Sequence, residues 1–302
     1  MTLNLLGSLP RPVALVAGSG GLNAAAQAGL LAAMTGWQPD LVLGSSGGAL
    51  TASCLAVTGD TTAAASLAVE AWRQVAASGL VQLGWAQVAG SLTGRENSRR
   101  TKQWLALFES LFADAWLAEE GTQALVATNL STGQPSLFTN GPVVPALMAA
   151  AAFPAVMTPA EQDGDILVDG SFAASLPVLQ AVDMGAASIV ALDTGRAQIT
   201  GESAAPSRWY DVVMASVRHQ VAANATHDVA TAATRVPVVM LSVADPFRVL
   251  AGDIDERISE GEAAGRTQLA ALKSRWASIH EPGVYTAADE VRLDRRLTGV
   301  VR

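Results

Sequence analysis

The stretch DLVLGSSGGAL, residues 40–50, contains an apolar run, five small residues and the start of a helix. The apolar run predicts a buried strand, and the alanines and leucines after it predict a helix from Gly47 to about Val57. The small residues fit G-x-S-x-G with Ser46 at the centre. A Cβ at Gly44 or Gly48 would collide with neighbouring backbone in so tight a turn. The turn would hold Ser46 in strained geometry with its hydroxyl exposed, the position of a nucleophile.

This pattern alone is weak evidence of catalysis, because a glycine-rich chain of this length can contain one by chance. The structural alternative is a tight strand-to-helix turn of small residues without chemistry. A location between a strand and a helix favours the nucleophile.

Length and composition predict a packed globular protein with one large domain or at most two small ones, and we interpret residues 1–302 as a single domain. Hydrophobic residues make up 50% of the 302 and mean hydropathy is +0.30. A formal charge of −8 argues against nucleic acid as a partner. The single cysteine, Cys54, excludes an internal disulfide and leaves no zinc-binding cluster; we expect it to be a buried small hydrophobic residue.

The first 18 residues lack a basic segment, and Pro10 and Pro12 break their apolar run, so we expect no signal sequence and a cytoplasmic protein. The uncharged stretch at residues 141–160 is about long enough to span a bilayer. Its four prolines would break the hydrogen bonding of a membrane helix. We interpret it as a buried core helix with entry and exit turns.

Apolar and helical segments alternate along the chain. Two strand-loop-helix units within the first fifty residues, with strands at 12–18 and 40–44, predict a parallel sheet with right-handed crossovers. Residues 60–120 are expected to be mostly helical. Further strands are predicted at 124–130, 136–140, 165–170, 188–195 and 236–243, and further helices at 144–152, 176–184, 209–233 and 254–276.

A second glycine-rich turn, AGSGGLNA at residues 17–24, follows the first predicted strand. Its consecutive backbone N–H groups suit an anion, either a phosphate or the oxyanion of a tetrahedral intermediate. A dinucleotide site would need G-x-G-x-x-G, but Asn23 stands at the third glycine, and a P-loop would need a lysine. An oxyanion hole needs only N–H groups, and those of Gly20 and Gly21 are the candidates.

A nucleophilic serine needs a base. The three histidines, His219, His227 and His280, lie late in the chain in helical or polar sequence, where a structural or solvated role is common. Asp169 ends the apolar run DILVD, and we expect that strand end to face the same sheet edge as Ser46. The structural alternative for Asp169 is a turn residue that closes a strand.

Three features in this order resemble the patatin-like phospholipases: a glycine-rich loop, G-x-S-x-G within thirty residues, and Asp-Gly after an alanine-rich, proline-flanked helix. The resemblance covers about residues 12–194. It implies an α/β fold of three layers, α/β/α, with a mostly parallel central sheet. It also implies that Ser46 is the nucleophile, that Asp169 is its base without a histidine, and that Gly20 and Gly21 supply the oxyanion hole.

The sequence departs from the family pattern at four positions. The family loop reads G-G-G-x-R-G, whereas here Ser19 replaces the first glycine, Asn23 the arginine and Ala24 the last glycine. Ser171 stands where the D-G-[GA] motif has glycine or alanine. How the loop is braced without the arginine is left open by the sequence.

The resemblance implies a serine acyl hydrolase that cleaves lipid esters, of phospholipase A or lysophospholipase type, through an acyl-serine and with neither cofactor nor metal. Two alternatives remain open at this point. The first is an α/β-hydrolase esterase in which Ser46, Asp169 and one histidine form a triad. The second is a degenerate relative that acts as a binding module.

The organisation implied is a motif-bearing core at about 12–195, a helical cap at about 60–120 and a C-terminal helix-strand-helix at 205–280. The segment Ser78 to Leu92 could cover the site, or could simply pack as a helix pair. The expected partner is a lipid or small ester, with transient, apolar membrane contact at most because the chain is acidic. Head group, acyl length and oligomeric state stay open.

Overall fold

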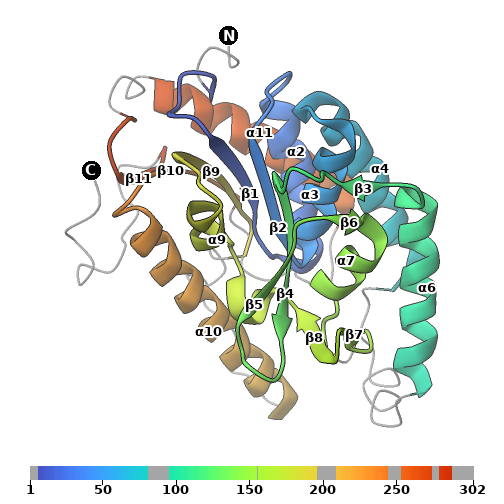
Figure 1. Ribbon diagram of the computed structural model, residues 1–302. Helices are drawn as coiled ribbons and strands as arrows, with labels where there is room; N and C mark the ends of the chain where they lie inside the picture. Colours follow the sequence, from blue (N-terminus) through green and yellow to red (C-terminus); the bar gives the residue numbers. More distant parts are fainter. Residues whose placement is uncertain are drawn as a thin grey trace.

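The computed structural model describes residues 6–80, 95–154, 156–195, 209–243, 253–273 and 279–287. Its main sheet has the strand order β11-β10-β9-β1-β2-β4-β8-β7, with β5 also paired to β4 (Figure 1). The strands are β1 (Val13–Ala17), β2 (Leu41–Ser45), β4 (Gln123–Asn129), β5 (Pro135–Phe138), β7 (Ala160–Gln162), β8 (Asp165–Asp169), β9 (Ser188–Asp193), β10 (Pro237–Ser242) and β11 (Gly283–Tyr285). Two further strands, β3 (Trp116–Leu117) and β6 (Gly141–Pro142), form a separate antiparallel pair.

The helices cover both faces of this sheet (Figure 1). They are η1 (Gly21–Ala25, a 3-10 helix), α2 (Ala26–Ala33), α3 (Gly47–Thr58), α4 (Thr61–Ser78), α6 (Arg95–Phe112), α7 (Val143–Ala150), α8 (Ser171–Ala174), α9 (Val178–Asp183), α10 (Trp209–Ala232) and α11 (Ile254–Leu272).

Alternate residues of the central strands face two separate cores. In β1, Val13 and Leu15 belong to the core shared with helices α2, α3, α4 and α11, whereas Ala14 and Val16 belong to the core shared with α9 and α10. Because side chains alternate across a strand, a strand that is apolar throughout must be covered on both faces. The predicted three-layer α/β/α fold is therefore confirmed.

The sheet is mostly parallel, as predicted, but not wholly so. Strands β11, β10, β9, β1, β2 and β4 are parallel, while β5, β8 and β7 are antiparallel to their neighbours. The segment at 141–160 forms a core helix as expected, α7, but short strands β6 and β7 flank it. The helix predicted at 176–184 begins two residues later because Pro177 is its N-cap residue, and β11 follows the helix that was expected to close the chain. Strands of two or three residues carry too little pattern to predict.

Helices α2 and α11 pack at very close range through small residues. A Cβ at Gly29 would overlap the carbonyl oxygen of Ile258, and a Cβ at Gly261 would overlap that of Ala26. Gly265 similarly faces Ala33, with 2.7 Å between the built Cβ and that of Ala33. Any larger residue at Gly29 or Gly261 would force the two helices apart.

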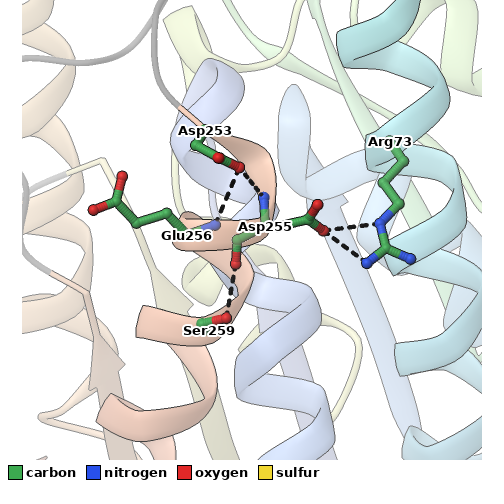
Figure 2. Close-up of polar contacts among 5 residues, drawn as sticks. All are labelled: Arg73, Asp253, Asp255, Glu256 and Ser259. Atoms are coloured by element: carbon green, nitrogen blue, oxygen red, sulfur yellow. Dashed lines mark hydrogen bonds and ion pairs between the residues drawn. The ribbon is translucent and has the colours of Figure 1, made fainter.

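The start of α11 is fixed by a cap and an ion pair (Figure 2). Asp253 accepts hydrogen bonds from the N–H groups of Asp255 and Glu256, at 2.8 and 3.4 Å. Arg73 of α4 donates to Asp255 Oδ1 through Nε at 2.8 Å and through its terminal nitrogen at 2.7 Å. Both side chains are more than half exposed, so this pair contributes at most about 1 kcal/mol and serves mainly as a contact between distant parts of the chain.

The region predicted as helical, residues 60–120, contains α4 and α6. Helix α4 packs in the core beside α2 and α3, with Ala64, Ala68 and Trp72 buried. The segment Ser78 to Leu92 lies outside the described residues from residue 81 on, so its role as a cap stays a prediction. Cys54 is fully buried, as expected, and burial raises the pKa of its thiol. Among the described residues, no helix is both long and apolar enough to cross a bilayer.

Candidate active site

Ser46 lies at the turn between β2 and α3 with φ 55° and ψ −126°. Positive φ is rare for a residue with a side chain and costs of order 1–3 kcal/mol, so the strain inferred from the sequence is present. The glycines have the predicted steric purpose. A Cβ at Gly44 would overlap the carbonyl oxygen of Gly48, and one at Gly48 would overlap that of Ala17.

The Ser46 hydroxyl donates directly to Asp169. Ser46 Oγ lies 2.7 Å from Asp169 Oδ2, although the two residues are 123 positions apart in the chain. Asp169 is 1% exposed, whereas Ser46 is partly exposed. The two residues singled out from the sequence therefore meet in space.

Ser46 and Asp169 meet although their strands run in opposite directions. Strand β8 does not run parallel to β2; it is antiparallel to β4, with Asp169 opposite Ala127. Strand β2 pairs with the first half of β4, up to Ser45 opposite Val126. Since β5 occupies the other edge of β4, β2 and β8 share one edge and approach each other end to end. The carboxyl ends of two opposed strands thus converge on one point.

The end of α7 holds both residues in place. The carbonyl oxygen of Ala150 accepts from the N–H of Ser46 at 3.2 Å and from that of Gly170 at 3.1 Å. The carbonyl oxygen of Ala152 accepts from the N–H of Asp169 at 3.0 Å. The alanine-rich sequence of this segment gave no signal of such a role, because the contacts use backbone atoms only.

Burial controls the electrostatics of Asp169. Removal from water raises the pKa of its carboxyl above the usual range. Hydrogen bonds from the side chain and backbone of Ser171 and from Ser46 lower it in part; the N–H of Ser171 lies 2.9 Å from Oδ1. The hydroxyl that replaces the family's glycine or alanine at position 171 thus helps to satisfy the buried carboxylate.

The glycine-rich loop packs against the start of α3, beside Ser46. The carbonyl oxygen of Gly21 lies 2.9 Å from where a Cβ of Gly47 would stand, and that of Gly18 lies 2.5 Å from the corresponding point at Gly48. The N–H of Gly18 donates to Leu192 and that of Ser19 to Ser175. Within the described part of the chain, no protein group accepts from the N–H of Gly20 or Gly21. These two N–H groups are therefore available to an anion.

Buried polar side chains brace this loop, and the residue pattern did not predict them. Gln27, fully buried on α2, donates through Nε2 to the carbonyl oxygen of Gly18 at 2.7 Å and to Thr194 Oγ1 at 3.3 Å. The hydroxyls of Ser19 and Ser175 lie 2.6 Å apart. Asn23, at the family's arginine position, is 4% exposed, and neither end of its amide has a partner among the described residues. Gln27, not Asn23, supports the loop.

The three histidines are exposed, whereas Asp169 is buried. His219 and His227 are exposed on α10, and His280 is exposed just before β11. None of them is a hydrogen-bond partner of Ser46 or Asp169 in the part of the chain described. Because the Ser46 hydroxyl already donates to a carboxylate, no imidazole stands between the two as in a triad.

The three-layer fold, with its sheet between two helical layers, defines an α/β protein. The strained serine at the end of β2 gives the β2–α3 turn the geometry of the nucleophile turn in serine hydrolases. The family model described as "Patatin-like phospholipase" matches residues 15–182, more than half of the chain. The chain therefore belongs to the patatin-like phospholipase family, a family of lipid acyl hydrolases. The resemblance inferred from three short motifs is confirmed.

Among solved structures, the chain is similar to one described as "Crystal structure of VipD from Legionella pneumophila", with 13% sequence identity and a TM-score of 0.44. The match covers 88% of this chain and 66% of that one, slightly less than two thirds of its length.

Proposed function

We propose that this protein hydrolyses carboxylic esters of lipids, as a phospholipase A or lysophospholipase, with Ser46 as nucleophile and Asp169 as base. The observation that carries the proposal is the 2.7 Å hydrogen bond from a strained, partly exposed serine to a buried aspartate. A nucleophile in direct contact with its base, beside two available backbone N–H groups, has the parts that acyl transfer requires.

In the first half of the reaction, Asp169 takes the proton of Ser46 while Oγ attacks the ester carbonyl carbon. The carbonyl oxygen becomes an oxyanion, which the N–H groups of Gly20 and Gly21 stabilise. The intermediate collapses by breaking the bond to the alkoxy oxygen, and the proton on Asp169 passes to the leaving alcohol. Ser46 now carries the acyl group as an ester.

In the second half, water replaces the alcohol. Asp169 takes a proton from the water as it attacks the acyl-serine, and the same N–H groups hold the new oxyanion. The bond to Oγ breaks, Ser46 regains the proton from Asp169, and the fatty acid leaves. The raised pKa of Asp169 favours the two attack steps, in which it accepts a proton, because it makes the carboxylate a stronger base than one in water.

The test is hydrolysis of p-nitrophenyl esters of increasing chain length and of phospholipid and lysophospholipid micelles by the parent chain and Ser46→Ala. Ser53→Ala is the matched control, because Ser53 is buried on the same helix and its hydroxyl bonds only the carbonyl oxygen of Ala49 among the described residues. We expect Ser46→Ala to lose at least about 10³-fold in kcat/KM and Ser53→Ala to keep near-parent activity. Turnover that survives Ser46→Ala, or a folded parent chain without esterase activity, would refute the proposal.

A further inference from the structure

The direction of the Asp169 carboxyl matters to the proposed reaction as much as its charge. Oδ2 accepts from the Ser46 hydroxyl at 2.7 Å, and Oδ1 accepts from the N–H of Ser171 at 2.9 Å. The bond from Ser171 closes a tight turn of backbone directly after Asp169. The path of the chain through this turn therefore sets the direction in which Oδ2 points.

The strand that carries Asp169 ends at this turn. Asp169 and Ala127 form the last pair of the β4–β8 ladder, and from Gly170 on the chain turns into α8, a helix of only four residues. A helix this short contributes little stability of its own, because its first N–H groups have no acceptor within the helix. Contacts from neighbouring elements must therefore fix the turn.

Thr128 provides such a contact from β4. Its hydroxyl donates to the carbonyl oxygen of Asp169 at 2.8 Å and accepts from the N–H of Ala173 at 3.1 Å. Thr128 is 4% exposed, so water has little access to replace either bond. One side chain thus joins the end of β8 to the first turn of α8.

Thr128 acts from the far side of the sheet. Ala127 is the cross-strand neighbour of Asp169, so the side chains of these two residues lie on one face. Thr128 is the next residue along β4, and its side chain therefore lies on the opposite face. Its hydrogen bond is to the main chain of Asp169, so any effect on catalysis must pass through the backbone.

The peptide unit that joins Asp169 to Gly170 is held at both ends. Its N–H donates to the carbonyl oxygen of Ala150 at 3.1 Å, and its carbonyl oxygen accepts from Thr128. The same carbonyl oxygen of Ala150 accepts from the N–H of Ser46, which ties this peptide unit to the nucleophile. Without the Thr128 hydroxyl one end would be released, and rotation of the peptide unit would turn the carboxyl away from Ser46.

In the proposed reaction Asp169 takes a proton twice and gives it up twice in each turnover. The carboxyl therefore has to keep its direction in both protonation states. From these contacts, and resting on the proposed function, we propose that Thr128 is a positioning residue for the base: its hydroxyl locks the peptide unit after Asp169 and so keeps Oδ2 directed at Ser46.

Replacement of Thr128 by valine tests this role, because valine has nearly the same shape and lacks the hydroxyl. We expect kcat for p-nitrophenyl butyrate, a soluble ester, to fall about 10- to 100-fold, since a displacement of about 1 Å can cost about 10²-fold in rate. KM should stay within about threefold of the parent value, because Thr128 acts on the base and not on substrate binding. Thr128→Ser keeps the hydroxyl and should return kcat to within about threefold of the parent.

Thr61→Val is the matched control. At a fully buried position, the Thr61 hydroxyl makes the same pair of bonds: it donates to the carbonyl oxygen of Met34 at 2.6 Å and accepts from the N–H of Trp37 at 3.1 Å. Met34 and Trp37 lie between α2 and the start of β2, whereas Ser46 follows the end of β2. The control should lower Tm about as much as Thr128→Val does and leave kcat unchanged.

A Thr128→Val variant that keeps kcat within threefold of the parent would overturn the proposal, whatever its Tm. So would a Thr128→Ser variant as slow as the valine variant. If Thr128→Val does not fold, Thr128→Ser and Thr128→Cys form the comparison, because they differ only in a hydroxyl and a weakly bonding thiol. The kcat of the cysteine variant should then be at least about threefold lower than that of the serine variant, and equal values would overturn the proposal.

Crystal structures separate this proposal from the proposed function. The distance from Ser46 Oγ to Asp169 Oδ2, 2.7 Å in the parent, should exceed about 3.5 Å in Thr128→Val and return in Thr128→Ser. If no form hydrolyses the ester while this distance follows the hydroxyl, the proposed function fails and the positioning role stands. If the parent hydrolyses the ester but neither kcat nor the distance responds to the variants, the positioning proposal alone fails.

Discussion

Replacement of Gln27 by methionine removes the donor that ties the glycine-rich loop to the rest of the site. Methionine matches glutamine in length and can fill the same buried space, but it cannot donate. The carbonyl oxygen of Gly18 would lose its 2.7 Å bond and Thr194 the 3.3 Å one, at a fully buried position. The replacement also removes the buried Oε1 of Gln27, which has no hydrogen-bond partner among the described residues. Its removal offsets part of the stability lost with the two hydrogen bonds.

A buried carbonyl left without a donor costs about 1–3 kcal/mol. For a chain of this size, 1 kcal/mol corresponds to about 2 °C in Tm, so we expect a decrease of roughly 2–6 °C. Gly18 contacts Gly48, two residues after Ser46, and the candidate N–H groups belong to the next two glycines of the loop. Loss of one oxyanion donor costs about 10²–10³ in kcat, so a misplaced loop should cost about 10–100-fold in kcat with KM changed little.

The assay is p-nitrophenyl butyrate hydrolysis, with kcat and KM measured separately, beside thermal unfolding. Gln123→Met is the matched control, because Gln123 also bonds backbone groups, Ala56 and Ala118, but at the other end of β4. The control should lose stability and keep kcat. If Gln27→Met loses stability while kcat stays within threefold of the parent, Gln27 is only structural and the bracing argument is wrong.

Three further outcomes follow from the site. Asp169→Asn should lose nearly all activity yet gain stability at neutral pH. Because burial raises the pKa of Asp169, the parent loses stability as pH rises above the unfolded pKa near 4. The gain in the free energy of unfolding, measured in urea, should therefore grow with pH above this value and become independent of pH below it; a gain that does not change with pH would contradict this. The free energy of unfolding of Ser46→Gly should be about 1 kcal/mol higher than that of Ser46→Ala, because glycine tolerates φ 55°. Equal free energies of unfolding would argue against strain at Ser46. Simultaneous replacement of His219, His227 and His280 by Gln should leave esterase turnover near the parent value. Loss of turnover in this variant would instead support a Ser-Asp-His triad.

The parts of the site that depend on local sequence were predictable. A strained serine at a strand-to-helix turn needs small neighbours, so Gly44 and Gly48 identify Ser46 directly. Asp169 was identified because an acidic residue at the end of an apolar strand must lie near the end of a sheet. The fold class followed for a similar reason, since strands apolar on both faces require helices on both faces.

The parts that depend on long-range pairing were not predictable. Nothing in DILVD tells whether its partner runs parallel or antiparallel, and here the strand runs against β4. The bracing of the loop by Gln27 was missed because a glutamine among alanines gives no periodic signal, and the role of Ala150 was missed because it acts through its backbone. Such contacts are visible only once distant segments are placed together.

The place of β1 in the sheet limits how far the family's motifs can be separated from the rest of the chain. β1 pairs with β2 on one side and with β9 on the other, and β9 begins only after the segment that the family model matches. A fragment that ended at residue 182 would carry Ser46, Asp169 and the glycine-rich loop. The edge of β1 that pairs with β9 would, however, have no hydrogen-bonded partner strand. We expect such a fragment to aggregate through that edge, since an open apolar strand is a template for pairing with other chains.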